Sequence, residues 1–441
     1  MKIKKQIYLW VVVAIAILAG GAGSANAAGK QSARQEIKAN PALSANNYQA
    51  YPDRALPTLP AAPSGYKPFF INHYGRHGSR WLLSDRSYRT FLRAMECADR
   101  NGKLTPRGKE VLEVMRQVTD AAYKRWGELS DIGAEQHRGI AERMYRNFPD
   151  VFVDGATINA RSTVIIRCIL SMQNEVDMLY SLNPRLNVNT SASRSTMRYM
   201  NYTDTVVRRM RGDYAAMRKS YMQRLVHPQN MLKRLFTDRK FVADSLGDPQ
   251  ELMTSFWDVA ANMQSHHQFE NVNLLDLFSD DDIYNMWRYE NIRWYLMSGN
   301  TPITKNRVTY MEANLLRSFI ADADLAVDNR RNAPGASLRF GHESVLLPLC
   351  CLMGIDGADY STTDLETLDN HWRSYHFFPM AGNVQLVYFA KPESNDILVL
   401  PLLNEHVATL PVATDAAPFY HWSEVREYFI DKLSHQPNVK Y

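Results

Sequence analysis

Cysteine is scarce in this chain of 441 residues, which contains only Cys97, Cys168, Cys350 and Cys351. Four thiols scattered over this length, two of them adjacent, do not make the disulfide framework of small secreted domains. None of the four has the spacing to a second ligand that zinc sites use. The sequence therefore excludes a disulfide-stapled scaffold and a cysteine-based zinc site.

The chain also has no large excess of positive or of negative residues. The formal net charge is +5, and three of these charges belong to Lys2, Lys4 and Lys5, which leaves +2 for the rest of the chain. A balance this close to zero gives no indication of nucleic-acid or membrane binding, and we expect no nucleic-acid partner. The composition, 45% hydrophobic and 22% charged, is that of a globular protein with one large domain or two to three smaller ones.

The apolar run from Ile7 to Leu18 is shorter than the ~20 residues that a membrane-spanning helix needs. It follows the three N-terminal lysines and precedes Ala25-Asn26-Ala27, a small-residue cleavage site. This pattern predicts a signal peptide at 1–27 and a mature chain exported to a periplasmic or extracellular space. A retained signal anchor is the alternative. After cleavage we expect no stable membrane insertion.

Strand-like and helix-like patterns alternate along most of the chain. Residues 28–65, rich in Ala, Pro, Ser and Asn, resemble a wrapped leader. Between 190 and 304 strand patterns vanish, and helical stretches rich in Met, Tyr, Trp and Arg replace them. The pattern predicts an α/β core at 66–189 and 305–441 with an inserted α-helical cap at 190–304. Strands are expected at 66–73, within 148–160, and at 336–340, 384–390 and 397–403, and core helices at 88–99, 106–125, 132–148, 162–182, 310–326 and 422–433.

Two histidine motifs each follow a predicted strand. The first is Arg76-His77-Gly78-Ser79-Arg80, and the second is Gly341-His342-Glu343. An imidazole can attack phosphorus while guanidinium groups hold the phosphoryl oxygens, and Gly78 allows the backbone to turn so that both arginines face one phosphate. Taken alone, the first motif is equally compatible with a strand-end histidine in a surface loop between solvated arginines.

The remaining motifs extend this pattern into a family resemblance. The first motif resembles the R-H-G-x-R signature of the histidine phosphatases. Arg161 to Arg167 resembles the segment where the clade 2 branch, the acid phosphatases and phytases, places a third phosphate-binding arginine. Gly127-Glu128-Leu129-Ser130 with Gly133 and Gln136 resembles the branch's G-x-L-T-x-x-G-x-x-Q helix start. Three features resemble the multiple inositol polyphosphate phosphatases: Arg167-Cys168, Phe340-Gly341-His342 followed by Leu346 to Leu349, and Leu402-Leu403-Asn404-Glu405.

This resemblance implies a phosphoglycerate-mutase-like core, in which a mixed central sheet is flanked by helices. It also implies that His77 is the nucleophile, and that Glu343 protonates the leaving alkoxide and later activates water. No metal or other cofactor is implied. The residues expected to bind phosphoryl oxygens are Arg76, Arg80, Arg167 and His342.

Two positions depart from the family pattern. Trp81-Leu82 follows the first motif, where the signature usually continues x-P. Glu343 is adjacent to His342, which is the spacing of the H-D phytases, whereas the subgroup usually has H-A-E. Glu343 is nevertheless the acidic residue nearest to His342, because Asp356 and Asp359 lie far along the chain.

Other charged residues have less specific signals. Arg161 could bind a neighbouring phosphate or could be solvated. His266-His267 could suggest a metal site, but adjacent histidines on a helix point apart, and we expect no metal. Residues 194–240 contain twelve basic against three acidic residues, which favours either a solvated helix face or a surface that attracts a polyanion.

The sequence thus predicts a metal-independent phosphomonoesterase that hydrolyses inositol polyphosphates, with inositol hexakisphosphate (phytate) as substrate. A broad acid phosphatase acting on sugar or nucleotide phosphates is the first alternative. The second is a binding protein for a phosphate ligand that lacks catalysis. The presence of both His77 and Glu343 argues against this last alternative, since binding alone needs no proton donor.

Overall fold

The computed structural model describes residues 31–437 except for 53–57, 203, 331–332 and 393. Ser32–Tyr441 forms one compact unit, to which the following description applies. The predicted signal peptide at 1–27 lies outside the described residues. Within the described part of the chain, no helix has the length and apolarity to cross a membrane.

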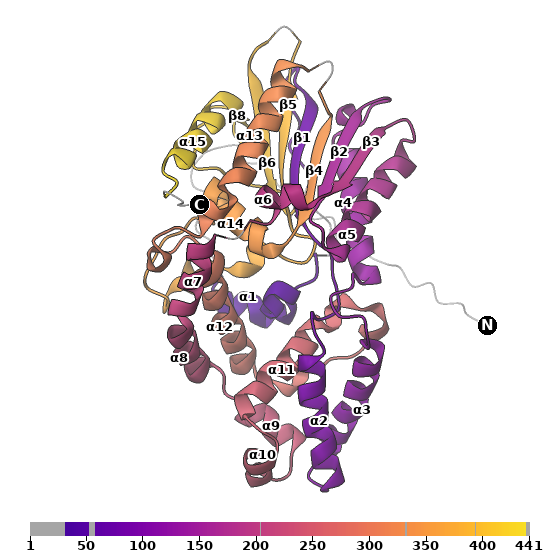
Figure 1. Cartoon of the computed structure of the whole chain (residues 1–441), viewed down its shortest axis with the longest axis vertical. Coiled ribbons are helices and arrows are strands. Elements are labelled where there is room, and N and C mark those ends of the chain that lie inside the picture. Colours follow the sequence, from indigo (N-terminus) through magenta and orange to yellow (C-terminus); the bar gives the residue numbers. More distant parts are fainter. Residues whose placement is uncertain (1–30, 53–57, 203, 331–332, 393, 438–441) are drawn as a thin grey trace, which may run out of the picture. The chain divides into compact units, whose positions relative to one another are not determined.

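The centre of this unit is a mixed eight-stranded sheet in the order β3-β2-β4-β1-β5-β6-β7, with β8 paired to β6 (Figure 1). Strands β1 to β4 run parallel, whereas β5 and β6 are antiparallel to their neighbours. This confirms the predicted fold class. The strands are β1 Lys67–Arg76, β2 Thr157–Ser162, β3 Asn187–Ala192, β4 Ala336–Gly341, β5 Asn383–Ala390, β6 Ile397–Leu403, β7 His406–Val407 and β8 Tyr420–His421.

Helices cover both faces of the sheet because its central strands are apolar on both sides. On one face pack α4 (Asp131–Asn147) and α5 (Ile166–Leu182), and their apolar residues form one cluster with those of β2 and β4. On the other face lie α13 (Ala313–Asp328), α14 (Glu343–Met353) and α15 (Trp422–Ser434) (Figure 1). Ser130 caps α4 as its sequence predicts: its hydroxyl accepts a hydrogen bond from the N–H of Gly133.

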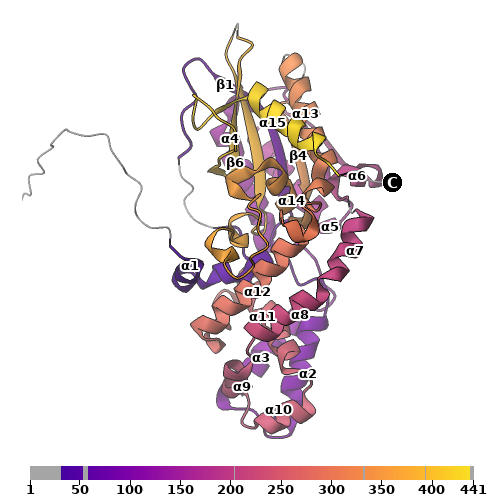
Figure 2. The same cartoon turned by 90° about the vertical axis from the view of Figure 1, so that its left-hand side faces the viewer.

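A separate apolar cluster holds the helical region together. It joins helices that precede β2 in sequence to helices between β3 and β4, and in both views these helices lie away from the sheet (Figure 2). The predicted domain boundary at 190 places the helices at 88–99 and 106–125 in the core, although they share this cluster with the later helices. The division into domains stays a prediction. The cluster includes α2 (Arg86–Arg100), α3 (Pro106–Ala121), α9 (Gln229–Leu235), α10 (Arg239–Ser245), α11 (Pro249–Asn262) and part of α12 (Asp280–Ser298).

The predicted leader contains ordered structure that packs against the helical region. Helix α1 (Ala33–Ala39) and the 3-10 segment Pro41–Tyr48 contribute apolar side chains to the same cluster. Glu36 accepts a hydrogen bond from Arg373 at 2.8 Å and another from Tyr375. The remaining helices are α6 (Met197–Met200), α7 (Thr205–Asp213) and α8 (Ala215–Leu225).

A fully buried histidine on β1 makes the stability of the fold depend on pH. Burial lowers the pKa of His73 to about 3, and neither ring nitrogen has a hydrogen-bond partner among the described residues. In the unfolded chain the same imidazole protonates at its ordinary pKa of about 6.5. Between these two values the unfolded state binds more protons, so the contribution of His73 to stability falls as the pH drops from 6.5 towards 3.

We therefore expect His73→Leu to reduce the pH dependence of unfolding. The loss of stability between pH 7.5 and pH 4.5 should shrink by about 2–3 kcal/mol, measured by urea denaturation at both pH values. A change in packing caused by the substitution alters the free energy of unfolding equally at both pH values. It therefore does not affect the difference between the two pH values for the same variant. An unchanged pH dependence would contradict the assignment.

Candidate active site

The C-terminal ends of three parallel strands meet at one edge of the sheet. Arg76 on β1 lies opposite Gly341 on β4, and Phe340 on β4 lies opposite Ser162 on β2. The N–H of His77 donates to the carbonyl of Gly341 at 2.9 Å, which ties the first motif to the second. Loops that leave this edge of an α/β sheet are where such folds bind ligands.

The loop after β1 is pressed against the N-terminus of α4. A β-carbon at Gly78 would lie 2.4 Å from the carbonyl oxygen of Gly133, and one at Gly133 would lie 2.2 Å from the carbonyl oxygen of Ser79. The backbone at Gly78 does not have a positive φ. Glycine is therefore required here for close approach rather than for the turn itself, and this contact accounts for the spacing of the α4 motif.

His77 presents one ring nitrogen to the pocket. Its Nδ1 lies 2.9 Å from the carbonyl oxygen of Gly78, which can only accept, so Nδ1 carries the proton and Nε2 carries the lone pair. Nε2 is 3.7 Å from Oε2 of Glu343. Burial, followed by the nearby guanidinium groups, lowers the pKa of His77 well below its ordinary value. The imidazole is thus neutral over the physiological range, as nucleophilic attack requires.

Arg76 is completely buried and held at several points. Its Nη1 donates to the carbonyl of Phe378 at 2.7 Å, and its Nη2 donates to the carbonyl of Asn47 at 2.6 Å. Its Nε lies 3.2 Å from Oε2 of Glu343. Burial lowers the pKa of Arg76 to about 10, so the group stays charged at neutral pH.

Two further arginines contribute to the electrostatics at His77. Arg80 is buried and donates from Nη1 to the carbonyl of Trp81, and Arg167 lies in the first turn of α5. Both act, with Arg76, to lower the pKa of His77. The Nε atoms of Arg80 and Arg167 are buried without a hydrogen-bond partner among the described residues.

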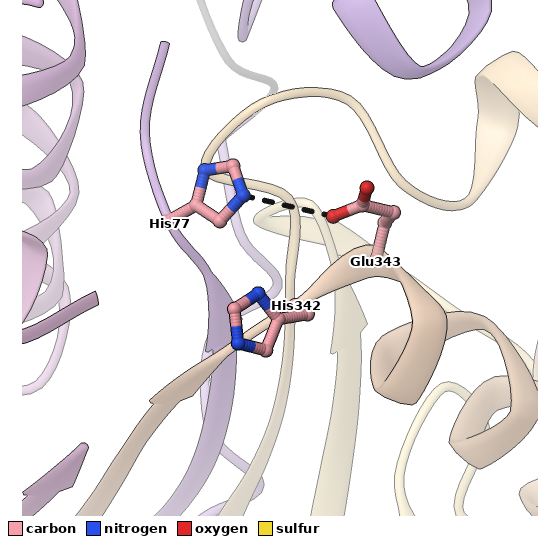
Figure 3. A group of neighbouring side chains, drawn as sticks. All are labelled: His77, His342 and Glu343. Carbon is pink, nitrogen blue, oxygen red and sulfur yellow. Dashed lines mark ion pairs between the residues drawn. The ribbon is translucent and has the colours of Figure 1, made fainter. Parts of the chain in front are cut away.

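The second motif completes the group (Figure 3). The N–H of His342 donates to the hydroxyl of Tyr74, and its ring Nε2 lies 3.3 Å from Oγ1 of Thr163. Burial lowers the pKa of His342 to about 4. The imidazoles of His342 and His77 are 5.7 Å apart between ring centres, at an angle of 74°.

Glu343 begins α14 and points towards His77 (Figure 3). Its side chain is 13% exposed. Burial opposes its charge, but Arg76 and Arg80 outweigh burial and hold the pKa of the carboxyl at about 2. The group is therefore ionised when the pocket is empty, and adding a phosphate dianion would offset the positive charge that keeps it so.

The same three side chains could also gather round a cation. One ligand atom from each of His77, His342 and Glu343 lies within 4.8 Å of the others. The charges of Arg76, Arg80 and Arg167 act at the same place and oppose a divalent cation. The electrostatics of the pocket therefore favour a phosphate anion.

Arg161 forms no hydrogen bond or ion pair with His77, His342, Glu343 or the three pocket arginines in the described part of the chain. Its guanidinium lies 3.9 Å from Oδ2 of Asp322 on α13, and it is about one-third exposed, at 34%. The same carboxylate pairs with the fully buried Arg339. A role for Arg161 in holding a neighbouring phosphate stays a prediction.

Three residues at the site carry no motif that marks them in the sequence. The carbonyl of Asn47 binds Arg76, and the ring of Tyr48 lies 5.6 Å from the guanidinium of Arg80. Both belong to the leader, whose composition gave no signal of a role. The side chain of Asn262 on α11 donates to the carbonyl of Arg80 at 3.0 Å. Only the folded chain brings these three to the pocket.

The structure also shows what Trp81, which follows the first motif, and the pair His266-His267 contact. Trp81 is buried, and its ring stacks on His266 at 3.8 Å between ring centres. His267 instead pairs with Glu135 at 2.8 Å. The adjacent histidines therefore serve separate contacts.

The profile of the family described as histidine phosphatase superfamily (branch 2) matches residues 75–404, which is most of the chain. The match begins just before the first motif and ends just after β6.

Two solved structures resemble the fold. One is the multiple inositol polyphosphate phosphatase of Bifidobacterium longum in complex with inositol hexasulfate: it has a TM-score of 0.71 and 19% identity, over 87% of this chain and 96% of that one. The other is the phytase from D. castellii, with a TM-score of 0.66 and 12% identity, over 94% of this chain and 90% of that one. At these identities the likeness establishes a shared fold.

Proposed function

The chain belongs to branch 2 of the histidine phosphatase superfamily, and on this basis we propose that it hydrolyses inositol polyphosphates through a phosphohistidine at His77. One observation carries the proposal. The neutral Nε2 of His77, the carboxylate of Glu343 and the charges of three arginines converge at the ends of β1, β2 and β4.

The pocket would bind the phosphoryl group before any bond changes. Donors from the three arginines and His342 would surround its oxygens, whose negative charge increases as the transition state forms. Because Arg76 is fixed by two carbonyl groups and Arg80 by one, these donors need little reorganisation. No metal is needed in this scheme, since the guanidinium groups supply the positive charge.

In the first chemical step the lone pair on Nε2 of His77 attacks phosphorus, and the bond from phosphorus to the inositol oxygen breaks. The departing oxygen takes a proton from Glu343, because an inositol alkoxide is a poor leaving group. Glu343 acquires this proton as substrate binds, when the phosphate offsets the charges of Arg76 and Arg80 that lower its pKa. The products of this step are the free alcohol and a phosphohistidine.

In the second step a water molecule attacks the same phosphorus from the side the alcohol has left. Glu343, now a carboxylate, accepts a proton from this water. The N–P bond breaks, its electron pair returns to Nε2 of His77, and inorganic phosphate leaves. The pocket returns to its starting protonation state once the phosphate has dissociated.

A polyphosphate substrate needs cations beyond the phosphoryl pocket, and the helical region supplies them. Helix α12 packs against α8 and the Pro41–Tyr48 segment. Arg293 on α12 and Arg218 on α8 both reach the sulfur of Met297, at 3.6 Å and 3.8 Å. Arg293 also acts on the pKa of Tyr48, whose ring adjoins Arg80. Arg293 is paired with Glu290 on the same helix, so Arg218 on the partly exposed face of α8 is the better candidate to bind a second phosphate.

The alternative is a broad acid phosphatase acting on sugar or nucleotide phosphates. A cation outside the pocket favours inositol polyphosphates over those of its substrates that carry a single phosphate. A monophosphate would occupy the pocket alone and gain nothing from Arg218. The other alternative, a binding protein without catalysis, does not need a proton donor, whereas the carboxyl of Glu343 lies 3.7 Å from the neutral nitrogen of His77.

Turnover of phytate beside glucose and nucleotide monophosphates tests the proposal. We expect phytate to have the highest kcat/KM at low salt, and to lose more of it as salt rises, since the Debye length shrinks to about 8 Å at physiological ionic strength. Arg218→Gln should raise KM for phytate by about 10-fold, equivalent to one charged hydrogen bond.

The monophosphates should be nearly indifferent to that substitution. Lys240→Gln is the matched control, because Lys240 belongs to the same basic segment but lies on α10 and pairs with Asp244. Equal salt responses for all substrates would refute the polyphosphate assignment, and absence of any turnover would favour the binding protein.

We also propose that the chain is exported after cleavage near Ala28. The support is the order of the N-terminal pattern: three lysines, a short apolar run and a small-residue site. Mass spectrometry of the protein from a periplasmic or extracellular fraction checks this, and an uncleaved N-terminus would favour the retained anchor.

A further inference from the structure

One peptide unit in the loop after β1 connects the imidazole of His77 to a side chain on α4. This unit joins Gly78 to Ser79. Its carbonyl oxygen accepts from Nδ1 of His77 at 2.9 Å, and its N–H donates to Oε1 of Gln136, also at 2.9 Å. Nε2 of Gln136 donates in turn to the hydroxyl of Ser79 at 3.0 Å. A peptide N–H can only donate, so the oxygen of the Gln136 amide must face it.

Holding the N–H of this unit also holds its carbonyl, because a peptide group is planar. The adjoining groups have partners of their own. The N–H of Gly78 donates to the hydroxyl of Ser171 at 3.1 Å, and the carbonyl of Ser79 accepts from the N–H of Ser130 at 2.9 Å. Among the described residues, Gln136 is thus the side chain that binds the N–H of the Gly78–Ser79 unit itself.

The neutral imidazole of His77 has one N–H proton, which can sit on Nδ1 or on Nε2. The carbonyl of Gly78 favours the proton on Nδ1, whereas the carboxylate of Glu343 favours it on Nε2. Oε2 of Glu343 lies 3.7 Å from Nε2 of His77. The same oxygen forms an ion pair with Nε of Arg76 at 3.2 Å, but it accepts no hydrogen bond among the described residues. A proton on Nε2 would face this carboxylate and gain a charge-assisted interaction. The lone pair would then sit on Nδ1, and Nε2 could not attack phosphorus.

We propose that Gln136 is a positioning residue that selects the Nδ1–H tautomer of His77 through the Gly78–Ser79 peptide unit. The inference rests on the proposed role of His77 as nucleophile. When phosphorus bonds to Nε2, the ring keeps its Nδ1 proton and becomes positively charged, so its hydrogen bond to the carbonyl strengthens. Gln136 should therefore affect phosphorylation more than substrate binding.

The kinetic test compares variants that keep or remove the acceptor. Gln136→Met, similar in length but without the carbonyl, should slow single-turnover phosphorylation by about 10–100-fold, by analogy with the loss when an outer partner of a metal-bound imidazole is removed. KM should change much less. Gln136→Glu retains an acceptor oxygen and should keep most of the rate. Gln173→Leu, on the exposed side of α5 where Gln173 binds Asp177, should match the wild type.

A second measurement reads the tautomer directly. Histidine-selective nitrogen-15 labelling gives signals from 12 histidines, and the His77 signal is the one lost in His77→Ala. We expect an unprotonated Nε2 in the wild type and a protonated Nε2 in Gln136→Met, with Gln136→Leu as the second variant if the first does not fold. The measurement needs no substrate, so its failure is distinct from that of the proposed function. Wild-type tautomer or wild-type phosphorylation rate in the variant would overturn the proposal.

Discussion

Replacing His77 by Ala is expected to abolish both turnover and the covalent intermediate. The loss in kcat should be on the order of 10⁵–10⁶-fold, as for removal of a covalent nucleophile in other hydrolases. Mixing the wild type with phosphorus-32-labelled substrate and quenching rapidly without acid should trap a labelled protein. An N–P bond is labile to acid, so acidifying this sample should release the label as inorganic phosphate.

His267→Ala is the control for this experiment, because that imidazole is about half exposed and binds Glu135 rather than the pocket. It should be phosphorylated at the wild-type rate. Chelators should leave the activity of the wild type unchanged, since Arg76, Arg80 and Arg167 supply the positive charge at His77. Inhibition by a chelator that a divalent cation reverses would refute the scheme and favour a metal bound by His77, His342 and Glu343.

The second large effect concerns the proton donor. Glu343→Gln keeps the shape of the side chain but removes its proton, so phosphoryl transfer from phytate should slow by the ~10²–10⁴-fold that general acid catalysis contributes. p-Nitrophenyl phosphate carries a leaving group that departs without a proton. Its single-turnover phosphorylation should therefore slow much less than that of phytate.

Single-turnover conditions matter for this comparison because Glu343 is also the proposed base for hydrolysis. Steady-state kcat can fall for both substrates if dephosphorylation becomes rate-limiting. Glu135→Gln, an exposed acid on α4, is the matched control and should have no effect on either substrate. Equal losses in the phosphorylation step for both substrates would mean that Glu343 positions the pocket and that another group protonates the alkoxide.

The sequence alone was informative where a function depends on residues close together in the chain. Arg76 to Arg80 is a run of five residues at the end of one strand, and His342-Glu343 follows another. Parallel strands place their C-terminal ends at one edge, so two such motifs could be expected to meet, and the structure places Nε2 of His77 3.7 Å from Oε2 of Glu343. The alternation of strand and helix patterns predicted the fold class for the same reason, since each pattern is local.

The tertiary structure alone decided which distant groups complete the pocket. Asn47 lies 29 residues before Arg76 and Phe378 lies 302 residues after it, yet both carbonyls bind its guanidinium. Nothing in the local pattern of the leader marks Asn47 or Tyr48 as neighbours of the site. The structure likewise gives Arg161 a partner in Asp322.

The charge states in the pocket also follow from the tertiary structure. In an unfolded chain His77 and Glu343 would have ordinary pKa values. In the folded protein burial lowers the pKa of His77, and Arg76 and Arg80 hold the pKa of Glu343 at about 2. Gln136 was visible in the sequence as part of a motif, but its action on His77 depends on the Gly78–Ser79 peptide unit. A linear pattern fixes residue types and local conformation, while desolvation, charge pairing and hydrogen bonds between distant segments exist only once the chain has packed.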